Sequence, residues 1–134
     1  MSSTNNLLAS ELMDKFIQLK RDAAKKGEYP SRLELCQRLA QMAAPRFYIS
    51  VDTALRMIVT PMNRDGKLPA RGRRRAMHLE LYKRYQILCA SHKREEAMQL
   101  AIEQPAPSYY VSPFRINYLL YAALKRRNNH HQQG

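Results

Sequence analysis

The residues with the clearest chemical potential are five cations near the middle of the chain, Lys67, Arg71, Arg73, Arg74 and Arg75. Residues 63–75 carry 6 basic and 1 acidic side chains, and the whole chain has a formal net charge of +12. Such a cluster attracts phosphates over long distances and accelerates encounters with polyanions. The cluster therefore predicts nucleic-acid binding. The alternative is a disordered linker that its charge keeps in solution.

The chain offers little that could catalyse a reaction. It has no glycine-rich phosphate loop and no His–Glu helix motif, and its four histidines are scattered. Glu95 and Glu96 are typical of the first turn of a helix rather than of an acid–base pair. Cys36 and Cys89 lack histidines at ligand spacing, so we expect reduced thiols without zinc. We predict a non-enzymatic protein with no catalytic residues, no metal and no cofactor.

An internal repeat organises the rest of the chain. Residues 45–58 read PRFYISVDTALRMI, and residues 107–120, which lie 62 positions later, read PSYYVSPFRINYLL. The similarity extends backward, because the apolar set Leu35, Cys36, Leu39 and Ala40 aligns with Ala97, Met98, Ala101 and Ile102. A duplication of this kind indicates two copies of one supersecondary unit. Copies of about 60 residues bury little surface alone, so we expect them to pack on each other or to dimerise.

The elements that must position the cations are helices. Low glycine content and apolar residues at steps of three and four predict an all-α protein. We expect two divergent three-helix units in tandem, packed together, with helices that begin near residues 7, 31, 50, 76, 94 and 112. The domains are residues 1–62 (first helical repeat), 63–75 (basic linker) and 76–134 (second helical repeat with a polar C-terminal tail that frays). No apolar stretch is long enough to cross a membrane.

The two aromatic pairs of the repeat should lie in extended connectors between helices. We expect Tyr48 and Tyr110 to plug the gap between the second and third helices of each copy. The alternative is that their rings stack on bases. Phe47 and Tyr109 are expected to be the more exposed partners.

The sequence ELCQRLA followed by YISVDTALRMI resembles the two halves of a bacterial helix-turn-helix, although QMAAPRF makes the turn longer than that family's. The resemblance implies that the third helix of each copy enters the major groove by its N-terminal end. Arginines there would reach guanine edges, and the serines that begin these helices would hold phosphates. The alternative is that the serines only cap their helices. The implied contact residues are Ser50, Thr53 and Arg56 in the first copy, and Ser112, Arg115 and Tyr118 in the second.

Two further resemblances concern short segments. Pro69 to Arg75 resembles an AT-hook, whose Arg-Gly-Arg core lies in the narrow minor groove, although Arg74 replaces the family's proline. The stretch PRFYIS is similar to small uncharacterised proteins of phages and mobile elements.

Together these features predict a nucleic-acid-binding protein, most simply a DNA-binding regulator or an architectural accessory protein of a bacterium, phage or mobile element. Its expected partner is DNA, with RNA as an option, and no membrane. A homodimer or an acidic protein partner is also compatible with the sequence. In the absence of a signal peptide we expect a cytoplasmic protein, with the nucleoid or a phage particle as alternatives. The competing functions are a helical structural or interaction protein, such as a phage particle component, and an RNA-binding module.

Overall fold

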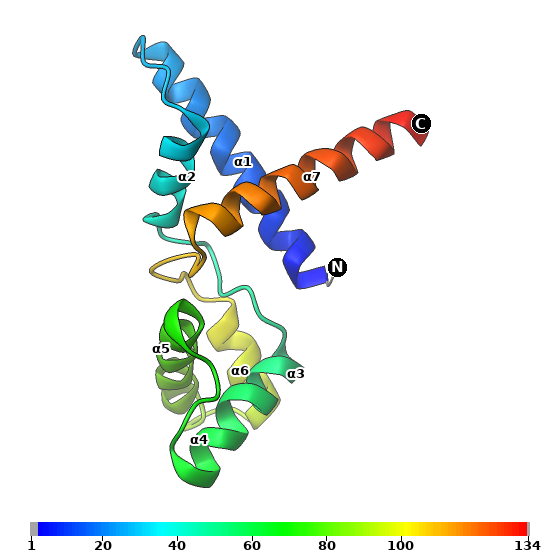
Figure 1. Ribbon diagram of the computed structural model, residues 1–134. Helices are drawn as coiled ribbons and strands as arrows, with labels where there is room; N and C mark the ends of the chain where they lie inside the picture. Colours follow the sequence, from blue (N-terminus) through cyan, green and yellow to red (C-terminus); the bar gives the residue numbers. More distant parts are fainter. Residues whose placement is uncertain (1–2, 134) are drawn as a thin grey trace. The chain divides into compact units, whose positions relative to one another are not determined.

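The computed structural model describes the backbone of residues 3–133 and the side chains of residues 4–128. Within residues 3–133 it contains helices and one isolated β-bridge, and no strands, so the predicted all-α class is confirmed. The helices appear in Figure 1. They are α1 (Ser3–Lys25), α2 (Arg32–Ala40), α3 (Val51–Ala54), the π-helical turn η1 (Leu55–Val59), α4 (Thr60–Asp65), α5 (Gly72–Leu88), α6 (Arg94–Ile102) and α7 (Pro113–Gln133).

The helices form two compact units that do not coincide with the sequence repeats. Unit 1 is Met1–Met42 with Val111–Gly134, and unit 2 is Ala43–Tyr110. Each unit therefore takes two helices from one repeat and its third helical segment from the other. In unit 1, α7 packs against α1 and α2, whereas in unit 2 α3 packs against α6, and η1 against α5.

Unit 1 is built from three amphipathic helices. The apolar stripe of α1 is largely buried, with Leu12 fully inaccessible to solvent and Leu19 only half-buried. Gly27 follows the end of α1, with a φ of 75°, and the Glu28 N–H donates to the Ala23 carbonyl at 2.9 Å. This is the left-handed Schellman arrangement that favours glycine. Facing α1 are the buried residues of the other two helices, namely Leu35, Cys36 and Leu39 of α2 and Ile116, Leu119, Leu120 and Ala123 of α7.

Unit 2 repeats the same burial pattern with different residues. Its α6 buries Ala97, Met98, Ala101 and Ile102; the first three align with buried residues of α2, and the fourth aligns with half-buried Ala40. The turn η1 precedes Pro61, which has no N–H to donate and would clash with the carbonyl four residues earlier. The wider π turn avoids this clash, since the Thr60 N–H bonds to the Leu55 carbonyl five residues back.

The two connectors pair within unit 2. Ala44 and Ala106 exchange both backbone hydrogen bonds at 2.9 Å in an antiparallel bridge. Beside it, the rings of Phe47 and Tyr110 stack with centroids 6.2 Å apart, and those of Tyr48 and Tyr109 stack at 6.1 Å.

The prediction of which ring in each pair is buried is wrong. Phe47 and Tyr109 are the buried members, 1% and 3% exposed, whereas Tyr48 and Tyr110 are half-buried. The cause is the backbone, because the Phe47 N–H bonds to the Ile102 carbonyl at 2.9 Å and thereby turns Phe47 toward α6.

The polar residues of the predicted C-terminal tail continue α7. The helix α7 runs to Gln133 without a break, and its Arg127 guanidinium pairs with Asp14 of α1 at 3.0 Å. Lys, Arg, Asn and Gln are compatible with helix once a packed segment has nucleated it. His130 and His131 lie outside the described side chains.

Candidate nucleic-acid interface

The basic segment, defined as Lys67, Arg71, Arg73, Arg74 and Arg75, lies where the chain passes from α4 into α5, and all five side chains are exposed. Arg71 is the N-cap residue of α5, with an extended backbone and no side-chain cap. Gly72 follows with a φ of 60°, a conformation that L side chains rarely adopt. The chain therefore turns at Gly72, and the next three arginines form the first helical turn of α5.

The basic segment is anchored, not a free linker. Leu68 and Ala70, which lie between Lys67 and Arg71, are 7% and 9% exposed. The Lys67 N–H also bonds to the Asp65 carboxylate at 3.1 Å. Because α5 already starts at Gly72, the alternative of a disordered linker over 63–75 does not describe this part of the chain.

The electrostatic environment of the basic segment is unfavourable in the protein alone. Arg73, Arg74 and Arg75 occupy the first turn of α5, where the helix dipole is positive, and that turn contains no acidic residue. Among the described side chains, no carboxylate pairs with any of the five cations. One turn deeper, His78 is 2% exposed, and burial together with the Arg74 charge lowers its pKa below 6.5. A bound anion would relieve this repulsion.

The AT-hook resemblance does not extend to backbone conformation. Arg73 to Arg75 are helical, whereas that motif reads the minor groove as an extended chain. The reason is local, because Leu68 and Ala70 pack into unit 2 and the left-handed Gly72 then starts α5.

The serines of the repeat cap their helices as expected. Ser50 Oγ accepts from the Thr53 N–H at 3.2 Å and donates to Thr53 Oγ1 at 2.9 Å. Ser112 Oγ accepts from the Arg115 N–H at 3.1 Å. The hydroxyl of Ser50 is therefore already engaged within the protein, which favours capping over a phosphate contact at that position.

The predicted contact residues separate into two groups. Ser50, Thr53 and Arg56 belong to unit 2, as does the basic segment, while Ser112, Arg115 and Tyr118 belong to unit 1. Arg56, Arg115 and Tyr118 are exposed, and Thr53 is half-buried. Moreover, α2 and α3, the two halves of the proposed helix-turn-helix, fall in different units. Second and third helices are thus combined across repeats, α2 with α7 and α6 with α3.

Two residues that the sequence reasoning missed lie in unit 1. Tyr121 is 57% exposed on α7, and the Arg32 guanidinium of α2 lies 4.3 Å from its ring centroid. Residues 114, 118 and 121 are aromatic at helical i, i+4, i+7 spacing, which could have revealed the tyrosine. No sequence signal joins Arg32 to α7, because the two are more than 80 positions apart.

The described residues contain no group of three or more potential metal ligands, and none of their helices could cross a membrane. The chain matches no protein-family model, no curated protein and no solved structure.

Proposed function

We propose that this protein is a non-enzymatic DNA-binding protein that holds the duplex backbone through the basic segment of unit 2. One observation carries the proposal, which is the exposed, unpaired cluster of cations at the positive end of α5. Arginines concentrated there destabilise their own helix, so the arrangement favours a polyanionic partner.

The density of charge favours a nucleic-acid duplex over a single strand. A duplex carries one phosphate per ~1.7 Å of axis, twice the density of a single strand. The basic segment presents its five cations from one short loop and one helical turn. Arg56 of η1, exposed in the same unit, is the candidate for a base contact because guanidinium donates twice to guanine.

Such a protein would act as a regulator or an architectural accessory protein in the cytoplasm of a bacterium, or with a phage or mobile element. Affinity would come from phosphate contacts, which position a protein without specifying sequence.

The test is a binding competition by fluorescence anisotropy over a salt series. A 24-base-pair DNA duplex, an RNA duplex of equal length and poly-glutamate are compared. If all five cations contact phosphates, log K against log salt for DNA should fall with a slope of about −4.5, which is 5 × 0.9. Tighter binding of the RNA duplex would indicate an RNA-binding module instead. Equal binding of poly-glutamate would indicate an acidic protein partner.

A further inference from the structure

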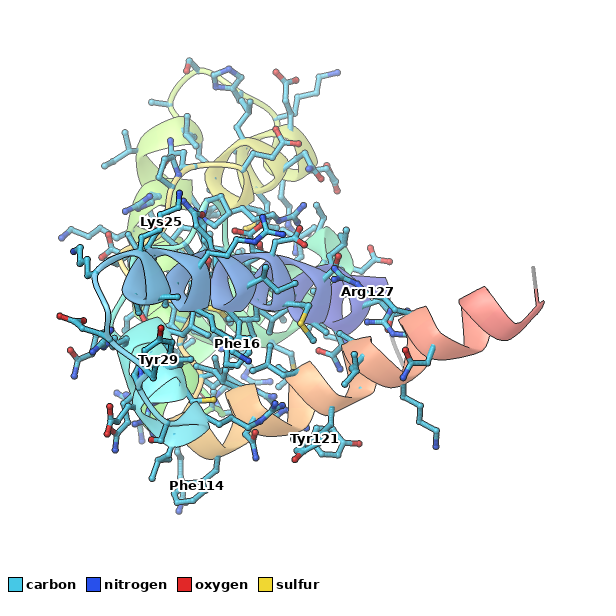
Figure 2. All side chains as sticks on the ribbon, turned by 90° about the horizontal axis from the view of Figure 1, so that it is seen from above. Phe16, Lys25, Tyr29, Phe114, Tyr121 and Arg127 are labelled. Carbon is cyan, nitrogen blue, oxygen red and sulfur yellow. The ribbon has the colours of Figure 1, made fainter. Side chains whose placement is uncertain are left out.

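The solvent face of α7 is aromatic. Phe114, Tyr118 and Tyr121 are 80%, 56% and 57% exposed, and Lys125 continues the same line one turn later. We call these four residues the α7 strip. The opposite side of the helix carries Ile116, Leu119 and Leu120, which are fully buried. In Figure 2, Phe114 and Tyr121 point away from α1, whereas Arg127 lies on the α1 side.

The strip is not a consequence of the repeat. The aligned positions of the first copy are Asp52, Arg56 and Val59, of which the first two are exposed and polar and the third is buried. Three large exposed rings in one line therefore occur on α7 and not on the aligned segment of the first copy. A row of large exposed rings of this kind is typical of an interaction site.

Cations accompany the rings. The Arg115 guanidinium lies 5.0 Å from the Tyr118 ring centroid, and that of Arg32 lies 4.3 Å from the Tyr121 centroid. Residues 111–134 carry 4 basic and no acidic side chains. Two copies meeting through this face would repel each other, which argues against self-association. The face instead complements a partner that is anionic and has flat apolar surfaces.

Tyr121 packs on a cation of the neighbouring helix α2. The Arg32 Nε donates to the Asn117 side chain, and its guanidinium lies 4.3 Å from the Tyr121 ring centroid and 5.4 Å from that of Phe16. The guanidinium therefore lies over one face of the Tyr121 ring. The backbone positions of neighbouring aromatic residues in the strip are about one helical turn, ~5.4 Å, apart along the axis of α7.

We propose that the α7 strip binds unpaired DNA, with bases stacked on Phe114, Tyr118 and Tyr121 and phosphates held by Arg115 and Lys125. Aromatic platforms flanked by cations are how single strands are bound without sequence preference. This inference rests on the proposed function only for the assumption that the nucleic acid is DNA, because the α7 strip is a different surface in a different unit. The duplex contact and the strand contact can therefore fail separately.

The experiment measures anisotropy of fluorescent dT12 and of a 24-base-pair duplex with the full chain. Each ring truncated to alanine should weaken dT12 binding on the order of 5- to 150-fold. The test variant is Phe114→Ala with Tyr118→Ala, and Tyr118→Phe should keep binding within about twofold because the ring remains. The matched control is Ile87→Ala, which removes an equally exposed apolar side chain from unit 2.

The expected result is loss of dT12 binding in the double variant, with duplex binding and melting temperature unchanged. If duplex binding is absent while the ring-dependent dT12 binding persists, the proposed function fails and the strip inference stands. The inference is overturned if dT12 does not bind, or if Ile87→Ala weakens it as much. It is also overturned if rU12 binds tenfold more tightly, or if sedimentation shows a dimer that the double variant abolishes.

Discussion

Replacing Arg71, Arg73, Arg74 and Arg75 with glutamine should change DNA affinity and protein stability in opposite directions. Each phosphate contact contributes about 0.9 to the salt slope on duplex DNA, so four lost contacts reduce it by about 3.6. When the salt concentration rises from 50 to 200 mM, the wild type should therefore lose about 150-fold more affinity than the variant loses. Binding isotherms at four or five salt concentrations measure it.

The same variant should be more stable than the wild type. Three of its four changes remove cations from the first turn of α5, where the dipole opposes them by at least ~0.3 kcal/mol each in an exposed setting. Glutamine and arginine have similar helix propensities, so little else changes. A gain of about 1 kcal/mol corresponds to a rise of roughly 3 °C in the melting temperature of a chain of this size.

The matched control removes four exposed cations from the other kind of helix end. Lys20, Arg21, Lys25 and Lys26 lie in and just after the last two turns of α1, and the dipole favours the cations nearest the helix end, Lys25 and Lys26. Replacing these four residues with glutamine changes the net charge by the same amount as the first variant does. It should lower the melting temperature and leave the salt dependence of DNA binding mostly unchanged. Equal slopes in the two variants would show that binding follows net charge alone and would refute the assignment of the basic segment.

Three other predictions concern the interior. The wild type should lose stability as pH falls below 6.5, because His78 is then protonated in the unfolded chain but not in the folded protein. His78→Phe, which introduces the residue found at the aligned position 16, should remove this loss, which is at most about 1.4 kcal/mol per pH unit. Melting curves from pH 7.5 to 5 measure it, and an unchanged pH dependence in the variant would contradict the prediction. The Arg84 guanidinium donates to the Pro105 carbonyl at 2.6 Å and lies 5.0 Å from the Phe47 ring centroid. Arg84→Lys should therefore lower the free energy of unfolding, measured in urea, by about 1–3 kcal/mol although the charge is the same. A decrease of less than about 0.5 kcal/mol would argue against this role. A thiol reagent should modify the exposed Cys89 in the native protein but should modify Cys36 only after unfolding. Cys36 is buried, and burial raises the pKa of its thiol. Fast modification of both thiols in the native protein would disprove the described core of unit 1.

Local features of the fold followed from the sequence. Most helix starts and the serine caps at residues 50 and 112 depend on neighbours within about four positions, which a sequence displays directly. The buried positions of α2 and α6 followed from the repeat for the same reason. The start of α5 did not, because a run of arginines gives no capping signal and Gly72 reads equally as a loop residue.

The candidate site was predictable in composition and not in geometry. The basic segment was identified as a set of cations, but its helical form depends on the burial of Leu68 and Ala70 against unit 2. The prediction for the connector rings failed because a backbone hydrogen bond from Phe47 to Ile102 decides their facing, and this pair lies 55 positions apart. Arg32 became part of the α7 surface only through folding.

By itself the sequence determined the helical class, the duplication and the excess of positive charge at mid-chain, since helix periodicity and charge density are properties of short segments. Only the tertiary structure decided that the third helical segments change places between the repeats, so that α7 packs with α2 and α3 with α6. The physical reason is that both copies bury apolar residues at aligned positions, such as Ile58 and Leu120, and either arrangement would cover them. Long-range contacts select one of the two, and they carry no signature in the local pattern.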